Sequence, residues 1–392
     1  MKTRMIFGEC KKGFTHYCTE RLSALSIKIY LILAMVSISI IAKSQNKMDI
    51  ASVRQDMMKY IENELQGANK PYGYYRQYPG DGEKYGLYGT LDISLIRTIM
   101  GENFHSSLTN KQRKEWVDFI NSFALEDGSY ESTWHNTTHR NGMVISALGP
   151  LGGKQIYPTT FYEEFNTVDK LISYLDNEVD WAQLWGGSLQ IWGGIIPYSL
   201  SKQSTQKWRK AAFKYLNENL DPNTGWWRKG VKHTDTFQPV GGGAHMWPIY
   251  QLHNKPFPYP EKVIDGILAL QLEDRTWYGA KENIRDGAYL DLDNLYGYAY
   301  MKSLAPGYKE KEIRKSVTKY GDYFLEYFYP NFYTSKPNGH KLLALVSIAG
   351  LLQELDPDRF YDSEGVDWTD IFSDPSLYMV KETECLSKKC KQ

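Results

Sequence analysis

The chain has 392 residues, of which 42% are hydrophobic and 23% charged, a globular composition that is long enough for one large domain or two ordinary ones. Its formal net charge is +0 and it has no basic patch, which argues against a nucleic-acid partner. Aromatic residues reach 14%, an excess that serves core packing and also suits stacking on flat ligands such as sugar rings.

The first predicted element is an uncharged apolar run at residues 29–42, flanked by Lys28 and Lys43. It is too short to cross a bilayer comfortably, and it suits the apolar region of a signal peptide with cleavage near Ser44. Residues 1–45 are therefore predicted to be a signal peptide or an N-terminal membrane anchor, the one part of the chain expected to meet a membrane. This interpretation places the protein in the periplasm or outside the cell.

From residue 46 onward the chain shows a repeat with a period of about 50 residues. Each unit has an amphipathic stretch with apolar side chains at helical spacing, as at Trp116, Phe119, Ile120 and Phe123. A turn that carries an aromatic residue follows. These aromatic residues are Tyr75, Tyr130, Trp181, Trp227, Trp277 and Phe332.

Less polar stretches alternate with the amphipathic ones and are predicted to be a second set of helices. They lie at residues 91–100, 142–148, 188–200, 244–252, 295–304 and 342–352. We predict an all-α fold, an (α/α)6 toroid of about twelve helices in six hairpins, with the apolar helices inside. An open helical solenoid is the alternative, and six units with an aromatic-rich inner set favour closure. The toroid is expected to span residues 46–375, before a polar C-terminal tail at residues 376–392.

The stretch LEDGSY at residues 125–130 resembles the QxxDGSW repeat of the terpenoid cyclase and protein prenyltransferase superfamily. Residues 264–277 keep the Gln, the acidic residue and the Trp of that repeat, with Arg275 where Gly is usual. In that superfamily the repeats join an outer helix to the next inner helix and are structural. The resemblance therefore implies a toroid in which Asp127 caps amides, Gly128 permits the turn and Tyr130 wedges between units.

Polar and aromatic side chains gather just before the predicted inner helices, where a toroid opens onto one mouth of its cavity. The predicted catalytic residues are Asp180, His245, Asp291, Asp293 and Tyr296. The predicted substrate-binding residues are Trp134, Arg140, Trp181, Trp185, Trp247 and His340.

Three Asp residues alternate with Tyr and Leu within residues 286–296. Asp291 and Asp293 are candidates for holding a metal, for a general acid with a raised pKa, and equally for caps of a helix that begins near Leu295. Their spacing is similar to the Asp-x-Cys zinc pair of protein prenyltransferases, and His340 has a place similar to that of their zinc His. Asp293 replaces the Cys, however, and the DxDD acid motif of squalene-type cyclases is absent.

His245 follows three glycines, which allow a backbone to approach a ligand closely. His135 and His139 have an i, i+4 spacing that suits a metal, although their stretch is predicted to be a loop. All four Cys lie in the leader or the tail, so the body offers no thiolate ligand. The sequence assigns no metal ligand and no cofactor, and it is compatible with a divalent metal.

These features favour an exported carbohydrate-active enzyme, a glycoside hydrolase or a polysaccharide lyase, whose partner is an oligosaccharide or polysaccharide. In a hydrolase the predicted Asp residues supply the carboxylates. In a lyase His245 or Tyr296 is the base, and Arg140 or Lys341 neutralises a uronate. The alternatives are a non-catalytic toroid that binds glycans or proteins and, from the resemblance, a terpenoid cyclase or prenyltransferase-like enzyme.

Overall fold

The computed structural model describes residues 47–378, which form an all-α fold, as the sequence predicts. The predicted signal peptide or anchor at residues 1–45 and most of the predicted tail lie outside the described residues. Among the helices that are described, none combines the length and the apolar character needed to cross a membrane.

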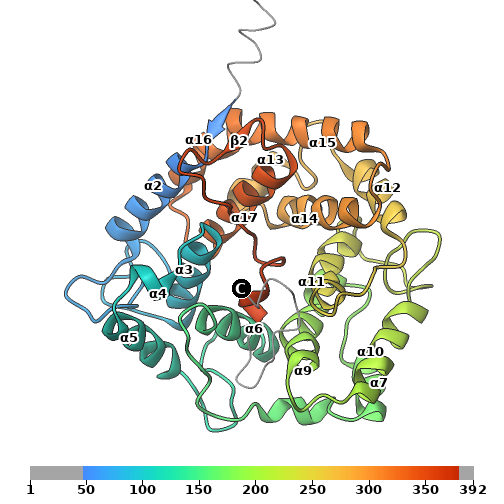
Figure 1. The fold of residues 1–392 in the computed structure, drawn as a ribbon, viewed down its shortest axis with the longest axis horizontal. Helices are drawn as coiled ribbons and strands as arrows, with labels where there is room; N and C mark the ends of the chain where they lie inside the picture. The colour runs from blue at the N-terminus through green and yellow to red at the C-terminus, as the bar shows by residue number, and fades with distance from the viewer. Residues whose placement is uncertain (1–46, 379–392) are drawn as a thin grey trace, which may run out of the picture. The chain divides into compact units, whose positions relative to one another are not determined.

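Six apolar helical segments pack in chain order around a common axis, each against the next, and α17 packs against α3 to close a ring (Figure 1). Their sequences are apolar on nearly every side because neighbours cover them on nearly every side, and all residues of α3 are buried. The segments are α3 (Leu87–Ile99), α6 (Thr137–Leu148), α8 (Leu184–Gly187) with α9 (Ile196–Leu200), α11 (Gln238–Leu252), α14 (Tyr289–Leu304) and α17 (Gly339–Leu355).

The third segment differs from the single helix predicted at residues 188–200. It is divided into α8, a π-helical turn at Ile191–Ile195, and α9. Pro197, the second residue of α9, lacks an amide hydrogen, and Gly193 and Gly194 weaken the helix before it, so the regular hydrogen bonding is interrupted there.

A second set of amphipathic helices lies outside the ring (Figure 1). In α10, for example, Trp208 and Leu216 are buried, whereas Lys207 and Lys214 are exposed. Side-chain caps begin several of these helices, such as Thr205, whose hydroxyl accepts from the Trp208 amide. The outer helices are α2 (Ala51–Tyr60), α5 (Asn110–Asn121), α7 (Val168–Asn177), α10 (Gln206–Glu218), α12 (Pro260–Leu270) and α15 (Glu310–Tyr323).

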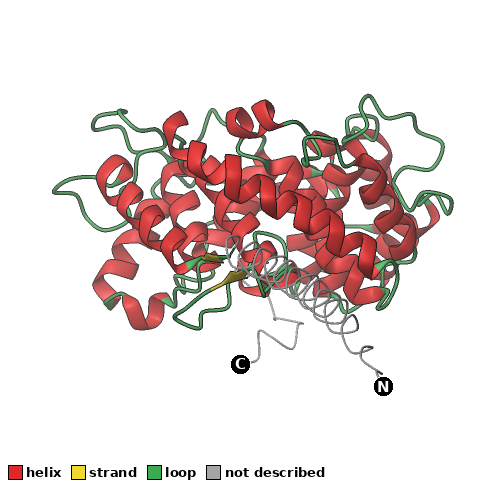
Figure 2. Ribbon diagram, turned by 90° about the horizontal axis from the view of Figure 1, so that it is seen from above, coloured by secondary structure: helices red, strands yellow, loops and turns green. Residues whose placement is uncertain are grey.

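The fold also contains short strands and helices that the sequence does not predict. Two-residue strands, β1 (Met48–Asp49) and β2 (Phe360–Tyr361), pair in parallel and tie the start of the described chain to the residues after α17 (Figure 2). The Arg54–Asp362 ion pair lies next to them. The short helices are α4 (Phe104–Ser107), α13 (Ala280–Asp286) and α16 (Tyr329–Phe332).

The chain after β2 turns inward and ends, among the described residues, near the centre of the ring (Figure 1). The Ser146 hydroxyl of α6 donates to the Leu377 carbonyl at 2.5 Å, and the Trp192 indole donates to the Tyr378 hydroxyl at 3.1 Å. Leu377 and Tyr378 are buried. The folded body therefore continues at least to Tyr378, past the boundary predicted at residue 375.

The LEDGSY stretch is a tight turn that leads out of α5. The carboxylate of Asp127 accepts from the Ser129 amide at 2.9 Å and from its hydroxyl at 2.6 Å, and the Leu125 amide donates to the Ser129 carbonyl. Tyr130 is buried and donates to Asn121 at 3.0 Å. The stretch is therefore structural, because its polar groups are used within the turn.

The tryptophans of the later turns have the same role. The indole N–H groups of Trp181, Trp227 and Trp277 donate to main-chain carbonyls at 2.7, 2.8 and 3.0 Å. Their acceptors, Leu175, Leu216 and Ile267, belong to the outer helix that precedes each turn. Each tryptophan therefore fixes a turn to its helix and fills the core with its ring.

Gly128→Ala should lower the free energy of unfolding by about 2–4 kcal/mol, the combined effect of a left-handed backbone and a steric clash. Gly128 has a φ of +79°, and a Cβ atom there would lie 2.0 Å from the Pro158 carbonyl oxygen. Gly307→Ala is the matched control, because it has a φ of +87° with nothing within 4 Å. Urea denaturation of both variants measures the difference, and equal losses would show that the Pro158 contact has no effect.

Candidate functional site

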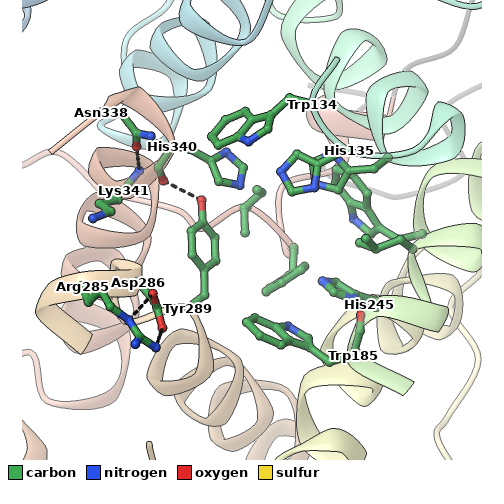
Figure 3. A pocket seen from close by; sticks show the side chains of 16 residues that line it. Trp134, His135, Trp185, His245, Arg285, Asp286, Tyr289, Asn338, His340 and Lys341 are labelled. Carbon is green, nitrogen blue, oxygen red and sulfur yellow. Dashed lines mark hydrogen bonds and ion pairs between the residues drawn. The ribbon is translucent and has the colours of Figure 1, made fainter. Parts of the chain in front are cut away.

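A cavity of about 400 Å³ opens within the ring, at the starts of α6, α14 and α17 (Figure 3). Aromatic, imidazole and a few charged side chains line it, with apolar residues of the C-terminal segment. The lining residues are Trp134, His135, His139, Trp185, Gly186, Leu189, Trp192, His245, Arg285, Asp286, Tyr289, Asn338, His340, Lys341, Ile371 and Phe372.

The apolar part of the cavity comes from both the ring and the C-terminal segment. Phe372 stacks on Tyr296 with ring centroids 4.8 Å apart, and its ring lies 6.0 Å from that of His245. Trp134 and Trp185 lie on opposite sides of the cavity in Figure 3, with Tyr289 between them along one wall. These flat faces suit a ligand with a flat or ring-shaped surface.

Three histidines meet on one side of the cavity, where His135 and His340 point toward each other beside Trp134 (Figure 3). One nitrogen from each of His135, His139 and His340 lies within 4.8 Å of the others. The centroid of the His135 ring is 4.0 Å from that of His139 and 5.5 Å from that of His340.

Two asparagine caps bring these histidines together. The Asn136 side chain accepts from the His139 amide at 2.8 Å and begins α6, and the Asn338 side chain accepts from the Lys341 amide at 3.0 Å and begins α17. Each cap places a histidine in the first turn of an inner helix, where side chains face the mouth of the ring.

Side chains from α3 contact the Nδ1 atoms of two of these histidines. His340 Nδ1 lies 3.0 Å from the buried carboxylate of Asp92, and His139 Nδ1 lies 2.7 Å from the Tyr88 hydroxyl. Burial raises the pKa of Asp92, and the nearby His340 partly offsets that rise. Burial also lowers the pKa of His135 to about 4 and that of His139 well below its ordinary value, so both are neutral at pH 7.

His245 lies on the other side of Trp192 from these three histidines. The ring centroids of His245 and Trp192 are 6.4 Å apart. Its Nδ1 is 3.1 Å from the Trp185 carbonyl and 2.9 Å from the Ser188 hydroxyl. Because a carbonyl only accepts, Nδ1 carries the hydrogen and Nε2 keeps a free lone pair. Burial lowers the pKa of His245 to about 4, so the imidazole is an unprotonated base at neutral pH.

Charged groups lie along the rim. The Lys341 ammonium has no ion-pair partner among the described residues, whereas Arg285 pairs with its neighbour Asp286 at 2.9 Å. Asp286 is also the one carboxylate among the described lining residues. The cavity therefore offers positive charge and imidazoles, and little acid.

Four of the predicted site residues line the cavity: Trp134, Trp185, His245 and His340. The other seven do not, and each has another observed contact. They are Arg140, Asp180, Trp181, Trp247, Asp291, Asp293 and Tyr296.

The three predicted catalytic carboxylates are used elsewhere. Asp291 is fully buried and accepts from the Trp277 amide at 2.8 Å and from Asn283 at 2.6 Å, so it ties a turn to α14. Asp293 is buried next to Trp185, and burial with the nearby Asp291 charge raises its pKa well above the ordinary value. Asp180 is exposed and caps the amides of residues 182 and 183 at 3.0 Å.

Helix α14 begins at Tyr289, so the predicted helix start near Leu295 is wrong.

The remaining residues are structural or positioning residues. Arg140 donates to the carbonyls of Ser132 and His135 at 2.9 and 2.8 Å, so it holds the loop before α6, and it is not among the residues that line this cavity. Trp247 is buried with its ring 5.8 Å from that of Tyr296, which donates to Gln251 behind the cavity wall.

The sequence offers His135, His139 and Lys341 as candidates without placing them in one site, and Tyr289 lies in the stretch 286–296, which stands out for its Asp residues. One sequence signal links the starts of α6 and α17. In each of them an Asn is followed within three residues by a His. No comparable pattern marks Ile371 and Phe372, which come from an irregular segment after the last repeat.

Comparisons with protein-family models, with curated proteins and with solved structures found no match to this chain. The resemblance to the terpenoid cyclase and protein prenyltransferase superfamily therefore stays a prediction.

Proposed function

We propose that the cavity binds an acidic oligosaccharide and cleaves it by β-elimination, with His245 as the base. One observation carries this proposal: aromatic faces, an unprotonated imidazole and the side chain of Lys341, which has no ion-pair partner among the described residues, line one cavity, while the predicted catalytic carboxylates lie outside it. An exported protein would meet such substrates, in keeping with the predicted leader.

The absence of acidic pairs from the lining favours a lyase over a hydrolase. Hydrolysis of a glycosidic bond ordinarily uses two carboxyl groups, about 5 to 10 Å apart, on either side of the bond. The described lining offers Asp286 alone, and Arg285 is bound to it. The same shortage of carboxylates disfavours the isoprenoid alternative, which needs an acid or a metal-bound diphosphate in the cavity.

In the proposed reaction, Lys341 neutralises the uronate carboxylate, which makes the hydrogen on the neighbouring carbon more acidic. His245 Nε2 removes that proton, a carbon–carbon double bond forms, and the bond from the β-carbon to the glycosidic oxygen breaks. The proton then passes from the imidazolium to the leaving oxygen. A low pKa suits this second step, because it makes the His245 imidazolium a strong acid.

Incubation of the purified full-length chain with uronate oligosaccharides should release products with the ultraviolet absorbance of an unsaturated uronate. The matched control is the same oligosaccharide with its carboxyl groups reduced to alcohols, which cannot undergo elimination and should not be cleaved. Products without the new absorbance would replace the lyase with a hydrolase. Thermal stabilisation without products would indicate a binding module in place of a lyase. If no oligosaccharide gives either products or stabilisation, the glycan proposal is overturned.

A further inference from the structure

We infer that His135, His139 and His340 together bind one zinc ion, with the fourth coordination position open to the cavity. This site goes beyond the proposed elimination, because it is argued from the protein's own side chains and depends on no substrate.

The spacing of the three imidazoles fits one small ion. Three nitrogens lie within 4.8 Å of one another, and a tetrahedral zinc with bonds of about 2.1 Å would bring them to about 3.4 Å. A small rotation of side chains closes that difference. His135 is the most solvent-exposed of the three, and its ring centroid already lies 4.0 Å from that of His139.

The partners of His340 are those of a metal ligand. Its Nδ1 faces a carboxylate, which leaves Nε2 for the ion, and carboxylate–histidine pairs of this kind commonly orient zinc ligands. Asp92 itself is fully buried, and its second oxygen has no hydrogen-bond partner among the described residues. A buried carboxylate is costly without compensating positive charge, and a cation bound to His340 supplies it. Gly339 permits the close approach, since a Cβ there would lie 3.0 Å from the Asp92 Cβ.

His139 is oriented in the same way from the same helix. The Tyr88 hydroxyl lies 2.7 Å from its Nδ1, and the two rings stack with centroids 5.8 Å apart. Its Nε2 is thereby directed away from α3. Two of the three histidines thus have their far nitrogens fixed by side chains one helical turn apart on α3.

The loop that carries His135 is built to hold it beside the other two. His135 has a φ of +57°, a conformation that is uncommon outside glycine and that is often found at functional sites. Arg140 holds this conformation through its bonds to the carbonyls of Ser132 and His135.

The donor set indicates zinc. Three imidazoles without thiolate or carboxylate ligands suit zinc and disfavour magnesium and calcium, which prefer oxygen. Three protein ligands with one open position are also typical of catalytic zinc sites, whereas structural zinc has four protein ligands. The open position would face the space between Trp134, Tyr289 and His340 (Figure 3).

Zinc binding to the metal-free protein tests the site in the absence of any substrate. The background should carry Ser at Cys10, Cys18, Cys385 and Cys390, because free thiolates bind zinc on their own. Titration calorimetry and metal analysis should find one zinc per chain. Cobalt in its place should give the intense visible absorption of a tetrahedral site.

Four variants separate this site from other histidines. His340→Ala and His135→Asn should each weaken zinc binding at least 100-fold, and Asn suits the left-handed backbone at position 135. Asp92→Asn should weaken it about 10- to 100-fold, as expected of a residue that orients a ligand. His105→Ala, which changes an exposed histidine on α4, should bind zinc as the parent does.

The melting temperature of each metal-free variant shows whether it folds, and saturating zinc should raise that of the parent but not that of His340→Ala. Binding below one equivalent, or equal affinity in the parent, His340→Ala and His135→Asn, would overturn the site. A variant that fails to fold leaves the test to His135→Asn, whose side chain is exposed. A protein that binds zinc yet cleaves no uronate would refute the proposed function alone.

Discussion

His245→Ala should lower kcat for cleavage of a uronate oligosaccharide by about 10²- to 10⁴-fold, the usual contribution of a positioned base. His245 is the imidazole in the cavity whose Nδ1 hydrogen is committed to the Trp185 carbonyl, so its Nε2 is free to accept a proton. KM should change little, because the aromatic walls and Lys341 remain. Steady-state rates from the ultraviolet absorbance of the product measure the effect.

His253→Ala is the matched control for this variant. His253 follows the same helix, and burial also lowers its pKa to about 4, but it bonds to the Ser199 hydroxyl and does not line the cavity. Its activity should stay within about threefold of the parent, as expected for a change away from reacting groups. Equal losses in the two variants would point to a shared effect on α11 and would contradict the role of His245 as base.

Asp291→Asn should remove a pH dependence of stability worth up to about 4 kcal/mol, since one pKa unit corresponds to about 1.4 kcal/mol. Burial raises the pKa of Asp291 from 3.8 to about 7, and the nearby Asp274 charge adds to that rise. The folded state therefore keeps a proton that the unfolded chain has lost. Its contribution to stability is present below about pH 4 and falls as the pH rises toward about 7.

Urea denaturation between pH 4 and 8 tests this expectation. Relative to the parent, Asp291→Asn should gain stability as the pH rises through that window. In this variant the oxygen of the new side-chain amide still accepts from the Trp277 N–H. The Asn283 side chain has an oxygen without a partner among the described residues, and after a half-turn of that side chain it can accept from the new amide NH₂. Asp180→Asn is the control, because that exposed carboxylate caps two amides which an amide oxygen also caps. Parallel curves for the parent and Asp291→Asn would show that Asp291 is ionised in the fold.

The helical class and most helix positions could be predicted because they depend on local patterns. Apolar spacing in α5, α7, α10 and α12 is that of amphipathic helices, and the turns carry residues that favour turns. The break between α8 and α9 was not predicted, although Gly193, Gly194 and Pro197 mark it. The parallel strand pair was also not predicted, because two residues are too few for a periodic signal.

The site was only partly predictable because residue type does not show which way a side chain faces. Asp291 and Asp293 looked like catalytic carboxylates in the sequence, yet both lie within helix α14 and face the core. His135, His139 and His340 are separated by up to about 200 residues, and the packing of both α6 and α17 against α3 brings them together. Phe372 reaches the cavity from an irregular segment, for which no sequence rule gives a direction.

The inward course of the C-terminal segment has a consequence for the proposed function. Ile371 and Phe372 line the cavity, and Leu377 and Tyr378, later in the same segment, are bonded to the inner ring. If the proposed polysaccharide is the substrate, we expect this segment to keep it from threading along the axis and sliding from one cut to the next. We then expect the polymer to enter by a chain end, to leave by the same opening, and to be cut at a constant distance from that end. A digest should therefore contain one short product from its first minutes, while the remaining polymer shortens gradually.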